Sequence, residues 1–346
     1  MTKKILHIGS CDKFLPPFIE FLKDNFNFDE HTFLLTRGMS YDEIPNYNNV
    51  KLSGIGRYAR FRFYNQVLLE MQKADKIILH GLFDIKIIQI LFLSPWLLKK
   101  CYWLIWGGDL YLYRIGPHNK KCNVKEFFRR TVIRNMGYLV TSINGDYELA
   151  KKWYRAKGEF IHSFYYTTNL FTPLTHKRQT RSAIYILVGN SADPTNQHME
   201  ILKKLEKYKN EDIVIYTPLT YGNKGYAEEV IDAGKKLYGS KFKPIINHMN
   251  EKDYILFLNQ IDIAVFNHNR QQAMGTTRSL LGMGKKVHMN QELSSAITLS
   301  NNGIKTFSLE DLNLNYKFPE SEKNVDRVRQ IYSSKELIRS LSCIFE

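Results

Sequence analysis

The chain has 346 residues, 44% of them hydrophobic, and a net charge of +15. This length predicts two domains, and no apolar run reaches the ~18 residues that a membrane-spanning helix needs. The four cysteines form no Cys-x-x-Cys pair, and Lys3 and Lys4 lead directly into a strand. The sequence therefore indicates free thiols in a reducing cytoplasm and no signal peptide.

Short apolar strands alternate with helices through the first half of the chain. Strands are predicted at residues 3–8, 31–35, 76–79, 99–105 and 138–142. Helices are predicted at residues 17–25, 57–73, 85–98, 120–135 and 145–157, the third of them broken by Pro95. Such alternation is typical of a parallel sheet with right-handed crossovers.

A polar stretch without periodicity, residues 169–182, is interpreted as an interdomain linker. A second alternating series follows, with strands at 184–188, 212–217, 244–246, 261–266 and 286–289. Its helices are predicted at 196–208, 225–238, 252–259 and 275–284, and a closing helix at 326–344. We therefore predict domains at 1–170 and 183–325, completed by 326–346. In such sheets ligands bind at the carboxyl ends of the strands.

The positive charge is concentrated in the first half. Residues 1–180 hold 27 Lys and Arg against 15 Asp and Glu, whereas residues 181–346 hold 22 against 19. This skew indicates a polyanionic partner, either an anionic membrane surface or a nucleic acid; a generally lysine-rich surface is the alternative. Because no zinc-finger, RNA-recognition or helix-turn-helix pattern is present, we expect no nucleic-acid partner.

The clearest motif of the second half begins at the strand 184–188. The loop Gly189-Asn190-Ser191 follows, and Asp193 with Pro194 predicts the start of a helix near Thr195,. Free N–H groups at such a helix start suit a phosphate or pyrophosphate. The alternative is an ordinary strand-to-helix turn, since neither a G-x-G-x-x-G fingerprint nor a Walker loop is present.

A second candidate follows the strand 261–266. Arg270 and the helix start at Gly275-Thr276 suit a diphosphate, because the guanidinium donates in a fork and the helix terminus supplies N–H groups. Asn290 and Glu292 follow the next strand, where a carboxylate would accept from ribose hydroxyls.

Polar residues also follow strands of the first half: Asp12, His80 and Asp109. His80 is alternatively a structural histidine bonded to a carbonyl, and Asp109 a simple cap. No Asp-x-Asp, zinc-ligand spacing or Ser/His/Asp order is found. The sequence therefore predicts chemistry without a metal ion.

Three motifs follow one another along the chain, at residues 105–111, 187–198 and 270–276. In this order they resemble the bacterial TDP-N-acetylfucosamine:lipid II N-acetylfucosaminyltransferases, glycosyltransferase family 56, over the full length of the chain. The sequence departs from the family pattern at Gly108, where the family has Ala, and at Ala192 and Ala273, where it has Gly.

The resemblance implies a GT-B fold, in which two α/β Rossmann-like domains face each other across a cleft. It implies inverting transfer from dTDP-4-acetamido-4,6-dideoxygalactose to an undecaprenyl-diphosphate-linked saccharide, as in enterobacterial common antigen synthesis. The protein would be peripheral, at the cytoplasmic face of the bacterial inner membrane, and would need no cofactor besides its donor.

On this resemblance, the second domain holds the nucleotide sugar through loop residues after its strands. The expected contacts are Gly189, Asn190, Ser191, Asn196, Tyr221, Arg270, Gln271, Gln272, Gly275, Thr276, Asn290 and Glu292. The first domain would supply the general base, with Asp109 as the first candidate and Asp12 and His80 after it. Its membrane contacts are expected at residues 57–62, 95–100 and 120–134.

Three alternatives remain from the sequence. A transferase of the same fold would use another nucleotide sugar or acceptor. A sugar-nucleotide epimerase or hydrolase would need no membrane-facing basic domain, and a basic nucleic-acid-binding protein would need neither sugar nor nucleotide. No pattern in the sequence indicates an oligomeric state.

Overall fold

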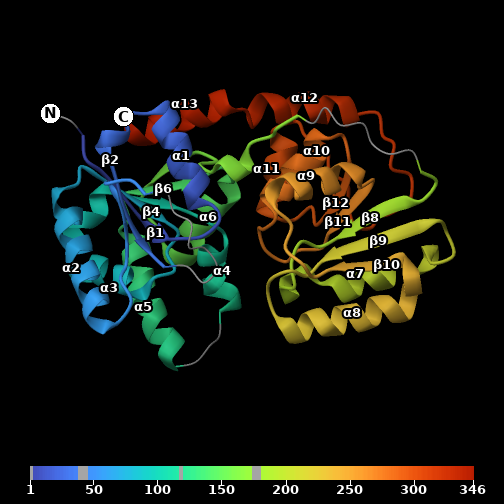
Figure 1. The fold of residues 1–346 in the computed structure, drawn as a ribbon, viewed down its shortest axis with the longest axis horizontal. Helices are drawn as coiled ribbons and strands as arrows, with labels where there is room; N and C mark the ends of the chain where they lie inside the picture. Colours follow the sequence, from blue (N-terminus) through green and yellow to red (C-terminus); the bar gives the residue numbers. More distant parts are fainter. Residues whose placement is uncertain (1–2, 38–45, 117–119, 174–180) are drawn as a thin grey trace. The chain divides into compact units, whose positions relative to one another are not determined.

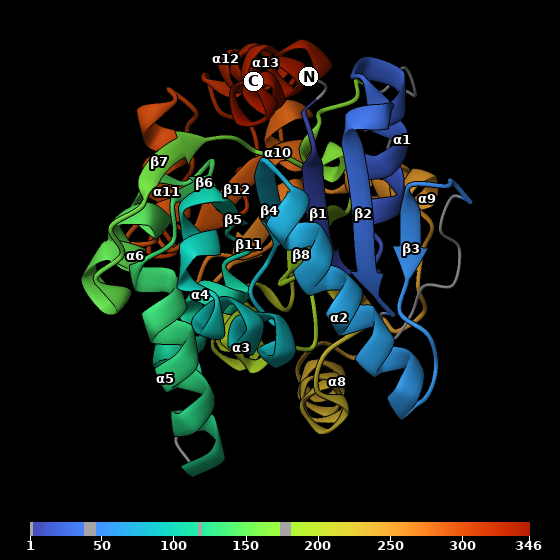
Figure 2. The ribbon, with the colours of Figure 1, turned by 90° about the vertical axis from the view of Figure 1, so that its left-hand side faces the viewer.

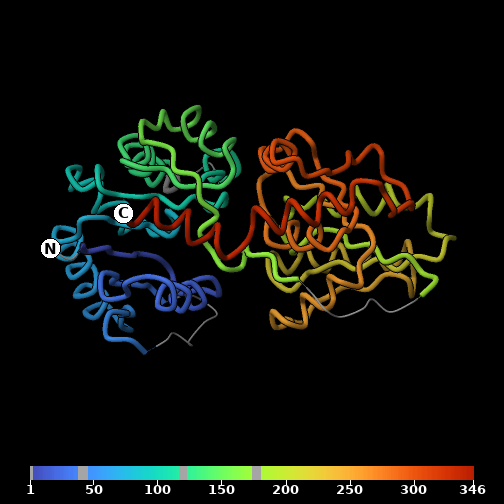
Figure 3. The backbone as a smooth tube through the Cα atoms, turned by 90° about the horizontal axis from the view of Figure 1, so that it is seen from above, coloured from blue at the N-terminus to red at the C-terminus, as the bar shows by residue number. Residues whose placement is uncertain are grey.

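The computed structural model describes residues 3–37, 46–116, 120–173 and 181–346. The chain divides into two compact units (Figure 1): the first comprises residues 1–169 and 334–346, and the second residues 170–333. Figure 3 shows both chain ends in the first unit, because the C-terminal segment returns to it. Each unit is described by itself.

The described residues of the first unit form a seven-stranded parallel sheet in the order β3-β2-β1-β4-β5-β6-β7. This is the Rossmann order, which reverses between β1 and β4. The strands are β1 (Ile5–Ser10), β2 (His31–Thr36), β3 (Val50–Leu52), β4 (Lys76–His80), β5 (Cys101–Leu104), β6 (Tyr138–Thr141) and β7 (Glu159–His162). The sequence did not predict β3 and β7, because these short edge strands lack a buried apolar run.

Helices cover both faces of this sheet. One face packs its apolar residues against α2 (Arg57–Lys73), α3 (Ile85–Leu93) and α5 (Lys120–Arg134). Contacts place α3 between α2 and α5 (Figure 2). On the other face, His7 of β1 contacts Phe18 of α1 (Leu15–Asn25) and Phe345 of α13 (Ser334–Phe345). The remaining described helices are α4 (Gly108–Ile115), α6 (Asn144–Tyr154) and the 3-10 turns η1 (Phe28–Glu30), η2 (Pro95–Lys100) and η3 (Thr167–Asn169).

The described residues of the second unit form a five-stranded parallel sheet in the order β10-β9-β8-β11-β12, which reverses between β8 and β11. The strands are β8 (Ile184–Val188), β9 (Ile213–Pro218), β10 (Phe242–Ile245), β11 (Ile263–Phe266) and β12 (Lys286–Met289). The helices are η4 (Pro194–Asn196), α7 (His198–Leu205), η5 (Glu206–Tyr208), α8 (Lys224–Tyr238), η6 (Gly239–Lys241), α9 (Glu251–Gln260), α10 (Met274–Gly282), α11 (Ser294–Asn301) and α12 (Ser321–Ile331).

The predicted single closing helix at 326–344 is wrong. The chain leaves the helical conformation at Tyr332, so that α12 belongs to the second unit and α13 to the first. Tyr332 is buried, with the Arg278 guanidinium 4.2 Å from its ring centre. In the first unit, Phe345 packs edge-on against His31, with ring centres 4.7 Å apart. These tertiary contacts break the helix, and no glycine or proline signals the break in the sequence.

Candidate functional site

The loop after β8 lies at the point where the strand order of the second sheet reverses. Gly189 has φ of +66°, in the left-handed region that favours glycine,. A Cβ there would lie 2.3 Å from His198 Nε2 and 2.9 Å from Asn196 Oδ1. Both the backbone conformation and the close approach therefore require glycine at this position.

Asn196 shapes this loop from inside. It is 1% exposed, and its Oδ1 accepts from the Asn190 backbone N–H (2.9 Å) and His268 Nε2 (3.1 Å). Its amide group donates to Ser191 Oγ (3.2 Å) and to the Asp193 carbonyl (3.0 Å). The structure thus places Asn196 as a positioning residue beneath the loop, whereas we had expected it to contact a ligand directly.

The predicted cap is confirmed, because Asp193 accepts from the Thr195 N–H and Pro194 follows it, but the helical segment that it starts is only the short 3-10 turn η4. The continuous helix predicted from Thr195 is wrong: Gln197 adopts the left-handed conformation, and α7 begins at His198. The His198 backbone N–H donates to the Tyr226 hydroxyl (3.1 Å), which covers the start of α7. The N–H groups expected here for a phosphate are therefore already occupied in part by a side chain of α8.

The start of α10, rather than that of α7, provides the helix N-terminus expected at this site. The residue before it, Ala273, has φ of +58° and caps nothing with its side chain. The first backbone N–H groups of a helix have no intrahelical acceptor, so those of Met274, Gly275 and Thr276 point outward. The left-handed position of Ala273 also fits the family's glycine there, since glycine adopts this conformation without strain.

Arg270 joins the two loops. Its guanidinium donates to Asp193 Oδ2 at 2.9 Å, with side chains 16% and 34% exposed. Burial favours a higher pKa for Asp193, but hydrogen bonds from Thr195 and the Arg270 pair lower that pKa below its usual value. Arg270 is therefore held beside the Gly189 loop, and its charge is balanced by a carboxylate.

Four buried polar atoms on these loops have no hydrogen-bond partner within the described part of the chain. They are Asn190 Oδ1, His198 Nε2, Gln271 Oε1 and Gln272 Nε2. Buried polar atoms without partners cost free energy, and they are commonly satisfied by a ligand or water. These atoms, together with Arg270 and the start of α10, make this edge of the sheet a candidate ligand site.

A third loop, after β9, reaches the same place. The Ala192 N–H donates to the Tyr221 carbonyl (2.8 Å), and Asn190 Nδ2 donates to the Tyr221 hydroxyl (3.1 Å). The Tyr221 side chain remains 54% exposed. Asn290 and Glu292, in contrast, follow β12 at the sheet edge, where Asn290 Oδ1 accepts from the exposed Glu292 N–H (3.0 Å). The structure brings Tyr221 to the Gly189 loop, and no interaction described in it joins Asn290 or Glu292 to that loop.

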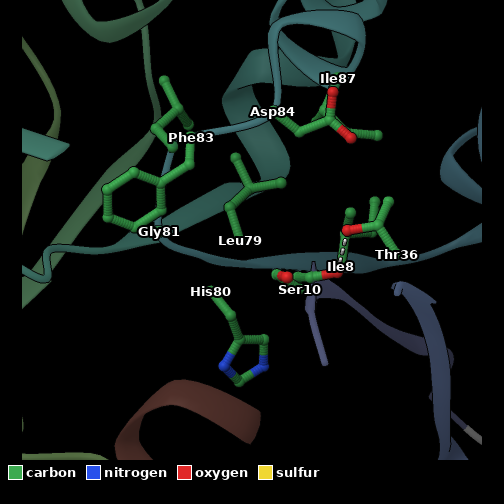
Figure 4. A pocket seen from close by; sticks show the side chains of 11 residues that line it. Ile8, Ser10, Thr36, Leu79, His80, Gly81, Phe83, Asp84 and Ile87 are labelled. Carbon is green, nitrogen blue, oxygen red and sulfur yellow. Dashed lines mark hydrogen bonds between the residues drawn. The ribbon is translucent and has the colours of Figure 1, made fainter. Parts of the chain in front are cut away.

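The first unit carries a pocket of about 240 Å³ at the carboxyl ends of β1, β2 and β4. Figure 4 shows its mostly apolar lining, with Ser10, Thr36 and Asp84 as polar members. The same view shows the His80 ring on the opposite side of β4 from Leu79. The pocket therefore meets the backbone of His80 more than its imidazole.

Both ring nitrogens of His80 are used inside the protein. The Trp106 indole donates to the Tyr166 hydroxyl (3.1 Å), which is hydrogen-bonded to His80 Nδ1 (2.7 Å). His80 Nε2 is hydrogen-bonded to His7 Nδ1 (3.0 Å), and His7 Nε2 to His31 Nδ1 (2.9 Å). Burial lowers the pKa of His80 to about 3. This arrangement disfavours His80 as a general base.

Asp109 is fully buried in the first turn of α4, and four N–H groups surround its carboxylate. Oδ2 accepts from the Leu82 backbone (2.9 Å) and the Trp103 indole (2.7 Å). Oδ1 accepts from the Trp106 (3.0 Å) and Leu110 (2.9 Å) backbones. Burial raises the pKa of Asp109, whereas these donors favour the charged form,. The geometry fits a carboxylate that fixes the Trp106 turn rather than one that takes a proton from a substrate.

We therefore predict that Asp109→Asn destabilises the fold. The amide would present N–H groups to donors that now meet a carboxylate, at a cost of about 2–3 kcal/mol in the free energy of unfolding. Denaturant unfolding followed by circular dichroism measures this cost. Unchanged stability together with lost activity would restore Asp109 as the base.

Asp12 is the remaining candidate, two residues beyond Ser10 of the pocket. Its Oδ1 accepts from the Phe14 N–H (2.9 Å), and the side chain is partly exposed. Burial raises the pKa of Asp12 to about 6. A carboxyl group with this pKa is largely ionised at neutral pH and basic enough to accept a proton. The ring of Phe14 packs edge-on against Trp106, with centres 5.0 Å apart.

Solved glycosyltransferases share this fold. A glycosyltransferase from Rickettsia africae ESF-5 is 14% identical over 99% of this chain and 98% of that one, with a TM-score of 0.67. The sucrose-phosphate synthase of Thermosynechococcus elongatus is 10% identical, covering 99% and 98%, with a TM-score of 0.64. WaaG, a glycosyltransferase involved in lipopolysaccharide biosynthesis, is 9% identical, covering 98% and 94%, with a TM-score of 0.60. The expected GT-B fold is confirmed.

The sequence itself carries a more specific match. Residues 47–328 match the family described as 4-alpha-L-fucosyltransferase, glycosyl transferase group 56. This match spans most of the chain, including the Trp106-Gly107-Gly108-Asp109 turn and both loops of the second unit. The chain therefore belongs to the 4-alpha-L-fucosyltransferase family, glycosyltransferase group 56.

Proposed function

We propose that this glycosyltransferase moves a 4-acetamido-4,6-dideoxygalactose-type sugar from a dTDP-sugar to an undecaprenyl-diphosphate-linked saccharide, with inversion and without a metal ion. The observation that carries the donor half is the cluster of four unpartnered polar atoms beside Arg270 and α10. The choice of sugar and acceptor rests on the family resemblance. The protein would act in bacterial surface-polysaccharide synthesis, in a pathway like that of enterobacterial common antigen.

The second unit would bind the nucleotide diphosphate at the carboxyl ends of β8 and β11. As the sugar leaves, negative charge grows on the diphosphate, and it must be neutralised. Arg270 and the N–H groups at the start of α10 supply this neutralisation. Because Arg270 is paired with Asp193 at 2.9 Å, the diphosphate would share or take over that guanidinium. Gln272 Nε2, which has no partner in the described protein, would donate to the diphosphate, whereas Asn190 Oδ1, an acceptor without a partner there, would accept from a hydroxyl or N–H group of the nucleotide sugar.

The first unit would bind the acceptor, and Asp12 would take the proton from its hydroxyl group. A single in-line displacement at the anomeric carbon inverts the configuration and needs one base on the acceptor side. Asp12 fits this role better than Asp109 or His80 because its carboxylate is partly exposed. It lies before residue 47, so the family match does not extend to it.

Three neighbouring elements of the first unit would contact an anionic membrane: α2, the α3–η2 segment and α5. Each carries strongly exposed apolar side chains, namely Tyr58, Phe61, Leu93, Trp96, Val124 and Phe127. Exposed cations accompany them, namely Arg57, Arg62, Lys99, Lys125 and Arg130. Apolar and cationic groups together favour peripheral attachment to anionic lipid. None of the described helices is long and apolar enough to cross a membrane.

One expected membrane contact is wrong. Arg129 was included in the basic stretch 120–134, but it is only 6% exposed and donates to the Asp109 carbonyl (3.2 Å). It also faces Glu126, with Nε 3.6 Å from Oε2. Arg129 thus holds α5 to α4 inside the unit. The side chains of Lys120 and Lys121 lie outside the described residues.

Membrane attachment is tested by reversing exposed cations while Arg129 is kept. A basic residue near an anionic surface contributes about 1 kcal/mol, so four reversals should abolish co-sedimentation with phosphatidylglycerol vesicles. The variant carries Glu at Arg57, Arg62, Lys125 and Arg130. The matched control carries Glu at four exposed lysines of the second unit, Lys235, Lys236, Lys243 and Lys252. Equal loss in both variants, or equal binding to neutral vesicles, would contradict the assigned surface.

The proposed reaction is tested with purified protein, a panel of nucleotide sugars and an undecaprenyl-diphosphate-linked saccharide, in EDTA. We expect transfer from dTDP-sugars, inverted product, and no loss of rate in EDTA, because Arg270 and helix N–H groups are the proposed counter-charges. Loss of activity that Mg²⁺ or Mn²⁺ restores would contradict the metal-free mechanism. Preference for another nucleotide would leave the fold assignment intact but change the donor, and sugar epimerisation without an acceptor would make the protein an epimerase.

A further inference from the structure

A second, smaller pocket of about 140 Å³ adjoins the first on the same unit. It is lined by Thr36, Arg37, Ser53, Gly54, Ile55, Arg60 and Tyr64. Thr36 also lines the first pocket. The Tyr64 hydroxyl donates to Asp84 Oδ2 (2.8 Å), and this pair links the lining of the two pockets. The two pockets are therefore neighbours on the first unit.

The second pocket is cationic, and one of its cations is fixed. Arg37 Nε donates to the Ser53 carbonyl (3.2 Å), and the Arg37 backbone N–H to Ser53 Oγ (3.2 Å). Ser53 is only 7% exposed, so Arg37 is hydrogen-bonded to a buried residue of the unit. Arg60 comes from the first turn of α2, a helix of 17 residues that has no side-chain cap at its start. Two guanidinium groups in one concave site suit a phosphate or diphosphate.

Within the described lining of the two pockets, the acidic residue is Asp84. Asp84 belongs to the first pocket, and its carboxylate accepts from the Tyr64 hydroxyl and from the Lys86 backbone N–H (2.8 Å). Burial and this carboxylate raise the pKa of Tyr64, so Tyr64 stays a neutral donor. Within the described lining of the second pocket, the arginines are the charged groups.

An apolar side chain also belongs to the second pocket. Ile55 is part of its lining and is 80% exposed. An anion site with an apolar rim, here Ile55, suits an amphiphile whose phosphate is joined to a hydrocarbon chain. A free anion would gain nothing from Ile55.

We propose that the Arg37–Arg60 pocket binds the diphosphate of the lipid-linked acceptor, with its saccharide in the adjoining first pocket and the start of its hydrocarbon beside Ile55. This assignment rests on the proposed function, since it names where that acceptor is held.

The decisive variant is Arg60→Ala, with Arg62→Ala as its matched control. Arg62 carries the same charge on the same exposed turn of α2 but lies about 200° around the helix from Arg60,. The probe is farnesyl diphosphate, with binding measured by calorimetry. We expect Arg60→Ala to weaken binding by about 10- to 100-fold and Arg62→Ala to leave it within about 2-fold. Arg37→Gln should act like Arg60→Ala, and equal weakening by the Arg62 variant would overturn the pocket.

Two further ligands separate a lipid diphosphate from other anions. Inorganic pyrophosphate should bind more weakly than farnesyl diphosphate; equal affinity would overturn the role of the apolar rim. Vesicles of phosphatidylglycerol should bind the Arg60 and Arg62 variants equally, because that interaction is a sum over the surface. A larger loss for the Arg60 variant would make the pocket a site for general anionic lipid and overturn the proposal.

The outcome is independent of whether the proposed transfer is correct. If the protein binds farnesyl diphosphate through Arg60 but transfers no sugar, the pocket is retained and the proposed function is refuted. The opposite result is that the protein transfers sugar and Arg60→Ala does not change the KM, either for an acceptor with a diphosphate or for one with a neutral alkyl group. That result would retain the function and refute the pocket. Affinity for dTDP should be the same in all three variants.

Discussion

Asp12→Asn is expected to lower kcat about 10²- to 10⁴-fold, the usual contribution of a general base. The amide retains an oxygen that can accept from the Phe14 N–H, so the local backbone should keep its conformation. What is lost is the ability to take the proton of the acceptor hydroxyl as the anomeric carbon is attacked. Steady-state kinetics with saturating donor and acceptor measure the change.

The pKa of Asp12 also predicts the direction in which activity should change with pH. Burial raises the pKa of Asp12 from 3.8 to about 6, and a base acts only when it is deprotonated. Activity should therefore be retained above pH 6 and fall as the pH drops through that value. The residual rate of Asp12→Asn should lack this step. A step that persists near pH 6 in the variant would assign the titration, and the base, to another group.

Stability separates Asp12 from Asp109. A pKa that is higher in the folded than in the unfolded state costs stability above that pKa, because the folded protein binds its proton more tightly. Asp12→Asn removes this cost and should raise the free energy of unfolding at pH 8 by about 1–2 kcal/mol. Burial raises the pKa of Asp109 as well, but four N–H groups donate to its carboxylate, and an amide cannot accept from all of them. Asp109→Asn should therefore lower the free energy of unfolding. A carboxyl group that lowers folding stability is typical of a functional group.

Much of the fold could be predicted from local patterns. The bounds of α2, β8 and β12 agree with the predicted residues, since apolar runs and periodicity there coincide with the elements. The break between α12 and α13 could not be predicted. It depends on Phe345 packing against His31 in the first unit, a contact between residues more than 300 positions apart. The local periodicity of the sequence contains no information about such a contact.

The candidate site shows the same division. Parallel strands place the residues that follow them at one edge of the sheet, so the Gly189 and Arg270 loops could be expected to meet. The true start of α7 could not, because it is set by the Tyr226 hydroxyl, 28 positions from His198. The role of Asp109 could not be predicted for a similar reason. Its partners include the Leu82 backbone and the Trp103 indole, and a sequence shows neither their approach nor their direction.

Arg270→Ala is expected to weaken dTDP binding by about 2–4 kcal/mol, the range for a desolvated charge-assisted contact. The fold should persist, since Arg270 is a loop residue whose ion pair with Asp193 is partly exposed. Calorimetry with dTDP measures the loss, and thymidine is the matched ligand control. Because thymidine lacks the diphosphate, its affinity should be equal in the variant and the unchanged protein.

Asp193→Asn tests whether the ion pair between Asp193 and Arg270 affects dTDP binding. Asparagine can still accept from the Thr195 N–H through its amide oxygen, but it no longer holds the Arg270 guanidinium by charge. If the diphosphate takes over Arg270, binding no longer has to compete with Asp193, and dTDP affinity should stay equal or rise. A loss as large as that of Arg270→Ala would mean that Asp193 presents Arg270 to the ligand. Unchanged dTDP affinity in a folded Arg270→Ala protein would remove Arg270 from the donor site altogether.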